Sequence, residues 1–125
     1  MARMLVIDDD PSIRSLIAGL LEACGHSVVT AENGRAGTKA FEQDRIDLVV
    51  TDIVMPEQEG IATISAIRRL SPSVPILAIS GSNTVGRHGD YLHAARVLGA
   101  SATLPKPIRP DHLIETIDRL LAAQR

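Results

Sequence analysis

The chain is short of several residue types, and each shortage narrows what it can be. Its single cysteine, Cys24, has no partner for an internal disulfide and is expected to be a small buried residue of a helix. No apolar run approaches the roughly 20 residues of a membrane span. The first such run, residues 4–7, is too short for a signal peptide. We therefore expect a protein of the reducing cytoplasm that does not interact with membranes.

An excess of charge of one sign is also missing. The chain has 13 basic and 15 acidic residues, a formal net charge of -2, and no long basic stripe. Nucleic-acid binding by this chain alone is therefore not expected. What is present is a 45% hydrophobic content over 125 residues, which is enough for one globular domain with a single core. No internal domain boundary is visible, so we treat residues 1–125 as one domain.

Short apolar runs alternate with helical periods along the chain. Strands are predicted at 4–7, 27–31, 47–51, 76–79 and 102–104, and helices at about 11–23, 35–43 (after an Asn33-Gly34 turn), 61–70, 90–98 and 110–122. This alternation is typical of βαβ units, and it predicts an α/β fold with a parallel sheet covered by helices. Pro105 has no N–H for a strand ladder, which places the last strand at an edge.

Polar residues stand where four of these strands end. Asp8 and Asp9 follow the first strand, Asp52 the third, Ser80 the fourth and Lys106 the fifth. Because the carboxyl ends of parallel strands share one edge of a sheet, these groups are expected to converge there. A set of carboxylates, a hydroxyl and an ammonium suits a divalent cation and a phosphoryl group.

The chemistry of such a site gives each group a task. Asp8 and Asp9 are adjacent and can reach one Mg²⁺, one directly and one through water. With a reference pKa of about 3.9, Asp52 is anionic at neutral pH and can act as a nucleophile. Lys106 and Ser80 can contact phosphoryl oxygens once the repulsion between phosphate and carboxylate is offset by the cation.

Each residue taken alone has a simpler interpretation. The Asp8-Asp9-Asp10 run, and Asp10 above all, fits a helix N-cap with first-turn acids, Asp52 an Asx turn, Lys106 a solvated lysine, and Ser80 a helix cap or loop hydroxyl. The joint arrangement, with each group at the end of a strand, favours the phosphoryl site over these separate explanations.

From about residue 3 to 123 the chain resembles a response regulator receiver domain of two-component signalling, of the stand-alone type without an output domain. The matching segments are Val6 to Pro11, Thr51 to Pro56 with Gly60 downstream, Ile79 to Gly81, and Leu98 to Ala100 leading to Lys106-Pro107. Together these segments are specific, whereas any one alone is weak. The resemblance implies a flavodoxin-like, doubly wound five-stranded sheet in the order 2-1-3-4-5.

The resemblance also implies roles for the residues that match. Asp52 resembles the aspartate that accepts a phosphoryl group from a histidine kinase or a histidine phosphotransfer protein. Asp8 and Asp9 resemble the acidic pair that holds Mg²⁺, with Asp52 and the main-chain carbonyl of Val54 as further ligands.

Two more roles follow from the same resemblance. Ser80 and Lys106 match the residues that contact the phosphoryl group. The Lys106-Pro107 peptide bond is expected to be cis, which is uncommon enough to be a test.

The chain departs from the family at two places. Thr103 stands where the family usually has the Tyr or Phe of an aromatic switch, and the only aromatic residues are Phe41 and Tyr91. Phe41 is expected on the core face of its helix, and we favour a packing role for Tyr91. The loop at 81–89 is glycine-rich and longer than usual. Any signal is therefore expected to pass through the backbone of this loop and the helix at 90–98.

The leading hypothesis is a switch, monomeric or weakly dimeric, that binds a target protein through the helix at 90–98, the strand at 102–104 and the helix at 110–122. It is not a metabolic enzyme, and its own chemistry is limited to self-phosphorylation and self-dephosphorylation. One rival is a phosphatase of the haloacid dehalogenase type, which needs a second acid where this chain has Val54. The other is an interaction module that is never phosphorylated, against which the complete set of polar site residues argues.

Overall fold

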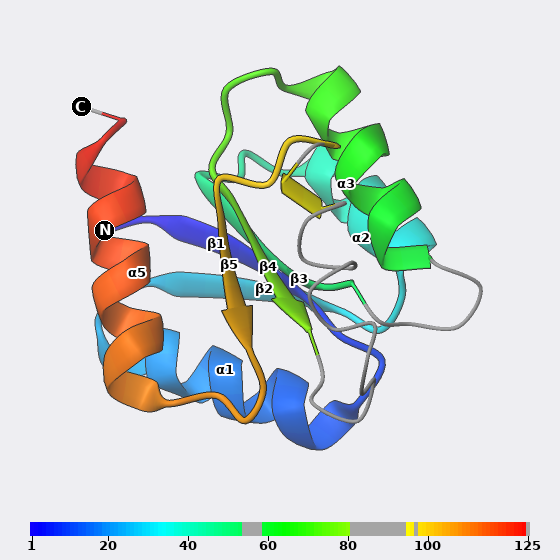
Figure 1. Cartoon of the computed structure of the whole chain (residues 1–125). Helices are drawn as coiled ribbons and strands as arrows, with labels where there is room; N and C mark the ends of the chain where they lie inside the picture. The colour runs from blue at the N-terminus through cyan, green and yellow to red at the C-terminus, as the bar shows by residue number, and fades with distance from the viewer. Residues whose placement is uncertain (54–58, 81–94, 97, 125) are drawn as a thin grey trace.

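The protein folds into a parallel sheet between two layers of helices. The computed structural model describes residues 1–53, 59–80, 95–96 and 98–124. Its elements are β1 (Arg3–Ile7), α1 (Pro11–Ala23), β2 (Ser27–Ala31), α2 (Gly34–Gln43), β3 (Leu48–Asp52), α3 (Glu59–Leu70), β4 (Ile76–Ser80), β5 (Ala102–Pro105) and α5 (Pro110–Ala122). The sheet has five parallel strands in the order β2-β1-β3-β4-β5 (Figure 1). The predicted fold class and strand order are confirmed, and β5 lies at an edge as the position of Pro105 indicated.

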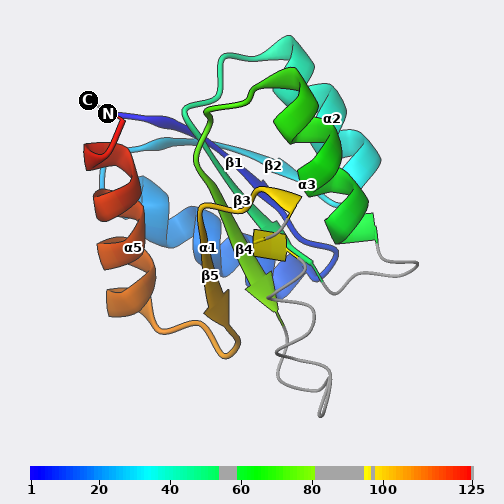
Figure 2. The same ribbon diagram turned by 45° about the horizontal axis from the view of Figure 1, so that its top comes forward.

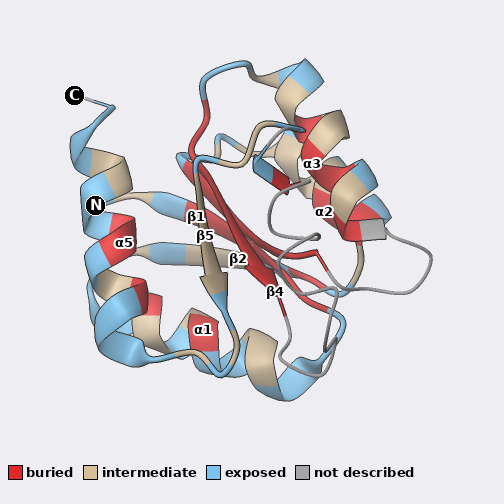
Figure 3. Ribbon diagram, in the orientation of Figure 1, coloured by how far each residue is buried: buried red, intermediate tan, exposed pale blue. Residues whose placement is uncertain are grey.

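Alternate residues of each central strand face opposite helical layers. Met4 and Val6 of β1 pack against α1 and α5, whereas Leu5 and Ile7 pack against α2 and α3. The two layers are visible on the two faces of the sheet (Figure 1, Figure 2). Strands β3 and β4 are buried over their full length (Figure 3). Each fully buried aliphatic side chain contributes about 1.5–3 kcal/mol to folding, so these strands form a firm base for the residues at their ends.

The register of the strands brings their carboxyl ends to one level. Ile7 pairs with Thr51, Asp52 pairs with Ile79, and Ser80 pairs with Pro105. We call this boundary the carboxyl edge of the sheet. Any side chain that immediately follows β1, β3, β4 or β5 therefore projects from the same edge.

The first helix begins and ends as its sequence indicates. The Asp10 carboxylate accepts a hydrogen bond from the N–H of Ser12 at 2.8 Å, and Pro11 occupies the first helical position. Gly25, with a φ of 91°, donates its N–H to the carbonyl of Glu22 and ends the helix. The N-cap interpretation of Asp10 is therefore the one found.

Three local predictions were wrong. Asn33 and Gly34 do not form a turn, since Asn33 caps α2 by accepting from the Ala36 N–H at 2.8 Å. Cys24 is exposed, because the helix ends at Ala23 and the chain turns away before residue 24 reaches the apolar stripe. Leu16, which the apolar spacing of the first helix predicts to face inward, is 45% exposed, since it lies about 100° around the helix from the buried Ile17.

Other predictions hold or differ only at the ends of elements. Ile64 and Ile67 are fully buried, and Phe41 packs against the core beneath α2 and α3. Strand β3 ends one residue later than predicted, so Asp52 is its last residue. Of the helix predicted at 90–98, residues 95, 96 and 98 are helical. The loop at 81–89 and Tyr91 lie outside the described residues.

No helix in the described ranges is long and apolar enough to cross a lipid bilayer.

Candidate functional site

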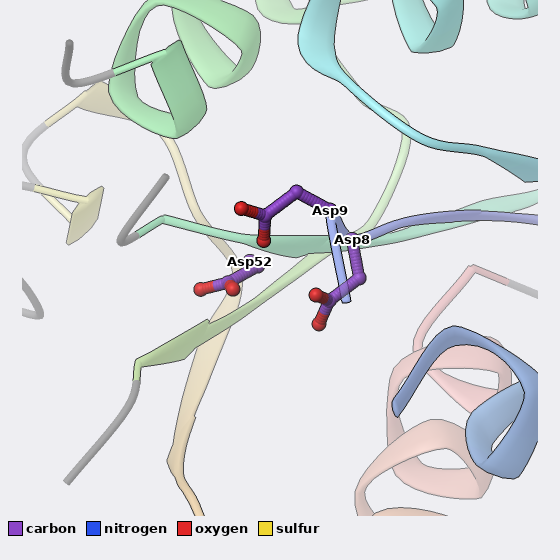
Figure 4. Close-up of side chains that lie close together, drawn as sticks. All are labelled: Asp8, Asp9 and Asp52. Carbon is purple, nitrogen blue, oxygen red and sulfur yellow. The ribbon is translucent and has the colours of Figure 1, made fainter. Parts of the chain in front are cut away.

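Three carboxylates meet at the carboxyl edge. Asp8 and Asp9 follow β1 directly, and Asp52 ends the neighbouring strand β3. One carboxylate oxygen from each lies within 4.8 Å of the other two (Figure 4). Asp8 and Asp52 are only 1% and 3% exposed, whereas Asp9 is exposed. The cluster therefore has a buried base and one open side, and we call these residues the acidic cluster.

The polar atoms of Asp8 have almost all found partners. Its N–H donates to the carbonyl of Ala31 at 3.2 Å, its carbonyl accepts from Arg14 Nη1 at 2.7 Å, and its Oδ1 accepts from the Asp10 N–H at 2.9 Å. Its Oδ2 is buried and makes an ionic contact, but no well-aligned hydrogen bond, within the described part of the chain. This oxygen is the one that faces an ammonium group.

That ammonium belongs to Lys106. Its Nζ hydrogen-bonds to Asp52 Oδ2 at 2.9 Å and lies 3.2 Å from Asp8 Oδ2, with the side chain 17% exposed. The Lys106 N–H donates to the carbonyl of Ser80 at 2.7 Å, which joins the end of β4 to the segment after β5. The Lys106-Pro107 bond is cis, as expected. Ser80 itself is completely buried as the last residue of β4.

The charges in this pocket shift two of its pKa values upward. Burial raises the pKa of Asp8, the charge of Asp52 adds to the rise, and the Asp10 N–H and the Lys106 ammonium oppose it without cancelling it. Burial acts to lower the pKa of Lys106, but the hydrogen bond and charge of Asp52, followed by the charge of Asp8, raise it overall. Lys106 is thus held mainly by Asp52, in agreement with the shorter of its two distances.

The acidic cluster fits a hard divalent cation. Three carboxylates against one ammonium leave two net negative charges when all four groups are ionised. The buried Asp8 Oδ2, which has the ionic contact with Lys106 but no well-aligned hydrogen bond among the described residues, is a ligand position that a cation would satisfy. Carboxylate oxygens beside open solvent suit Mg²⁺, which keeps several water ligands. The Val54 carbonyl, predicted as a further ligand, lies outside the described residues.

Two residues near the site could not be singled out by sequence reasoning alone. Arg14, in the first half of α1, holds the carbonyl of Asp8. Gly60, in the first turn of α3, lies against the backbone of Asp52 and Ile53, so closely that a Cβ there would overlap with main-chain atoms. Gly60 belonged to a matched segment but had no assigned task, and a bond from an arginine to a main-chain carbonyl leaves no pattern in a sequence.

A separate cleft of about 810 Å³ lies at the opposite edge of the sheet. It is lined by residues that include His26, Asp47, Pro75 and Gln124, and by none of the acidic cluster. Within the described residues, the site is recognised by its grouping of charges.

Comparisons with known proteins agree on one family. The sequence profile of the response regulator receiver domain matches residues 4–118. Protein PilH of Pseudomonas aeruginosa is 34% identical over 127 residues, which cover 98% of this chain and 99% of PilH. The transcriptional regulatory protein GlrR of Escherichia coli is 32% identical over 120 residues, and ZraR of Salmonella typhimurium is 35% identical over 122. This chain spans only 26% and 27% of the length of these two regulators.

Solved structures give the same result. The chemotaxis protein CheY4 of Vibrio cholerae superimposes with a TM-score of 0.85 at 31% identity, covering 97% of this chain and 99% of CheY4. A response regulator receiver domain protein of Clostridium thermocellum gives a TM-score of 0.89 at 30% identity, covering 99% of this chain and 97% of that one.

Proposed function

This chain belongs to the response regulator receiver domain family, and on that basis we propose that it is a phosphate-accepting switch of cytoplasmic two-component signalling. In this proposal Asp52 accepts the phosphoryl group, and Asp8, Asp9 and Asp52, with the Val54 carbonyl, hold Mg²⁺. The observation that carries the proposal is the meeting of the acidic cluster with the Lys106 ammonium at the carboxyl edge.

The transfer itself is a substitution at phosphorus. A carboxylate oxygen of Asp52 forms a bond to the phosphorus as the bond between phosphorus and the donor's imidazole nitrogen breaks. The electron pair of that bond stays on the nitrogen, and the ring leaves as neutral imidazole because the other ring nitrogen of the donor carries a proton. Bound Mg²⁺ supplies positive charge that offsets the repulsion between carboxylate and phosphate.

The residues around Asp52 complete the site. The Lys106 ammonium lies 2.9 Å from Asp52 Oδ2. Once that carboxylate has reacted, the ammonium is close enough to form an ion pair with a phosphoryl oxygen instead. Ser80 ends the adjacent strand, and its hydroxyl is the proposed donor to another phosphoryl oxygen. Movement of Lys106 and Ser80 toward the phosphoryl group would change the ends of β4 and β5 together, because the Lys106 N–H donates a hydrogen bond to the Ser80 carbonyl.

The proposed donors are a histidine kinase or a histidine phosphotransfer protein, and the proposed output is altered affinity for a separate target protein. The proposed target surface comprises the segment 90–98, which the sequence predicts to be a helix, together with β5 and α5. The match to PilH over nearly the full length of that protein supports a receiver with a core at about 3–123. The valine at position 54 argues against the dehalogenase-type phosphatase, which requires an acid there.

Incubation with a small phosphodonor such as acetyl phosphate tests this proposal. In the presence of Mg²⁺ the intact mass is expected to increase by one phosphoryl group, and chelation of the metal is expected to prevent the increase. Asp52→Asn should abolish labelling. Asp44→Asn, the same change in an exposed ion pair with Arg3 away from the site, should label like the wild type. Equal labelling of the Asp52→Asn protein would overturn the assignment.

A further inference from the structure

The loop between β1 and α1 consists of Asp8, Asp9 and Asp10 alone, and it carries two of the three members of the acidic cluster. Such a short connection leaves few ways to aim two carboxylates at a shared point. Its ends are fixed by the bond from the Asp8 N–H to Ala31 and by the Asp10 cap on α1. What remains to be fixed is the peptide plane between Asp8 and Asp9.

Arg14 fixes that plane. Its Nη1 donates to the carbonyl oxygen of Asp8 at 2.7 Å, from a partly buried position one turn into the helix that follows. This hydrogen bond is charge-assisted and is shorter than an ordinary hydrogen bond between two amide groups. Rotation of this carbonyl would also rotate the N–H of Asp9, and would therefore redirect both carboxylates.

We propose that Arg14 is a positioning residue that sets the geometry of Asp8 and Asp9 for metal binding, an inference that rests on the proposed function. With the Asp8 carbonyl held by Arg14 and Oδ1 held by the Asp10 N–H, Asp8 Oδ2 is left facing the acidic cluster. Arg14 acts through the main chain, since its hydrogen bond to this loop is to the carbonyl oxygen of Asp8 and not to a carboxylate.

A role for Arg14 through its charge predicts the opposite behaviour. A guanidinium close to a cation site repels the cation, so its removal would tighten Mg²⁺ binding. Loss of a positioning contact instead weakens binding, since the acids no longer converge.

The test compares Mg²⁺ affinity in wild type, Arg14→Ala, Arg14→Lys and a matched control, Arg3→Ala. Arg3 lies at the other end of β1 in exposed contacts with Ser27 and Asp44, so its removal takes away the same charge far from the site. Loss of an outer contact to a metal ligand typically costs 10–100-fold in affinity. We expect Arg14→Ala to bind Mg²⁺ at least about tenfold more weakly. Arg14→Lys, which keeps a donor, should fall between that variant and wild type, and Arg3→Ala should be unchanged.

A second readout needs no metal. In the metal-free protein, exchange of the Asp10 amide proton reports its bond to Asp8 Oδ1, and Arg14→Ala should accelerate it severalfold more than Arg3→Ala does. Unchanged exchange together with unchanged or tighter Mg²⁺ binding in Arg14→Ala would overturn the inference. If Arg14→Ala fails to fold, Arg14→Lys decides by the same two measurements. Absence of Mg²⁺ binding in wild type would instead refute the proposed function, while the exchange comparison would still decide the role of Arg14.

Discussion

Replacement of Gly60 by alanine tests how tightly α3 packs against the strand that carries Asp52. A Cβ at this position would lie 2.8 Å from the carbonyl carbon of Ile53, and nearer still to Ile53 Cα and the Asp52 carbonyl oxygen. All three are main-chain atoms, which cannot move aside by a change of rotamer. Carbon atoms in ordinary contact are about 3.5–4.0 Å apart, so α3 and the end of β3 must separate by about 1 Å.

The cost of this separation can be estimated from two opposing effects. Overpacking a close-packed interior typically costs about 1–3 kcal/mol. Alanine is favoured over glycine inside a helix by up to about 1 kcal/mol. The net expectation for Gly60→Ala is a loss of about 1–2 kcal/mol in the free energy of unfolding. A displacement of about 1 Å at a nucleophile can lower a rate by about 100-fold, so phosphorylation of the folded variant should fall by a larger factor than its stability implies.

Two other glycines provide matched controls. Gly19, on the exposed side of α1, has no atom within 4 Å of an added Cβ, so Gly19→Ala should be as stable as wild type or slightly more stable. At Gly37 a Cβ would crowd the side chain of Ile7, with Cγ1 at 2.7 Å, so Gly37→Ala should lose stability through side-chain packing instead. Urea denaturation gives the stabilities, and the rate of labelling by acetyl phosphate gives the activity. If Gly60→Ala matched Gly19→Ala in both measurements, the packing argument would be refuted.

Three further predictions concern charged groups. Lys106→Gln removes the ammonium that competes with a cation for the acidic cluster. Mg²⁺ binding in a calorimetric titration should therefore tighten by about tenfold, or about 1.4 kcal/mol, while labelling by acetyl phosphate slows. Weaker Mg²⁺ binding would contradict this prediction. The pKa of Asp8 is higher in the folded protein than in the unfolded chain. In the metal-free protein, the stability contributed by Asp8 is therefore complete below its unfolded pKa of about 3.9, and it is lost as the pH rises through its folded pKa. Asp8→Asn should therefore gain stability over wild type as the pH rises from 4 to neutrality, and a gain that shrank over this range would oppose the assignment. Arg68 donates to three main-chain carbonyls at the other end of β4, so Arg68→Ala should lose about 2–3 kcal/mol in urea denaturation without altering Mg²⁺ affinity.

The parallel sheet and the grouping of the acids could be anticipated from the sequence for one physical reason, whereas the strand order followed from the resemblance to the receiver family. Parallel strands that are buried on both faces read as short apolar runs, and whatever follows those runs must meet at one edge. The positions of Asp8, Asp52 and Lys106 relative to their strands were enough to place them together, whatever their individual tasks.

Features that depend on three-dimensional approach could not be anticipated in the same way. The exposure of Cys24 is decided by the exact turn at which α1 ends, and that of Leu16 by its angle around the helix. The contact of Gly60 with the Asp52 backbone and the bond from Arg14 to the Asp8 carbonyl join positions with no periodic relation. Local sequence patterns predict helices and strands, whereas the contacts that hold the site residues in place form only when those helices and strands pack together.

The most direct test of the central claim is to locate the phosphorylated residue. Acetyl phosphate and Mg²⁺ would be used to label the protein, and borohydride reduction would then convert an aspartyl phosphate into homoserine, which peptide mass spectrometry can place in the sequence. Homoserine is expected at position 52 and at no other aspartate, with none formed when Mg²⁺ is chelated. Homoserine at Asp8 or Asp9, or a stable phosphoryl group on a hydroxyl side chain with position 52 unchanged, would contradict it.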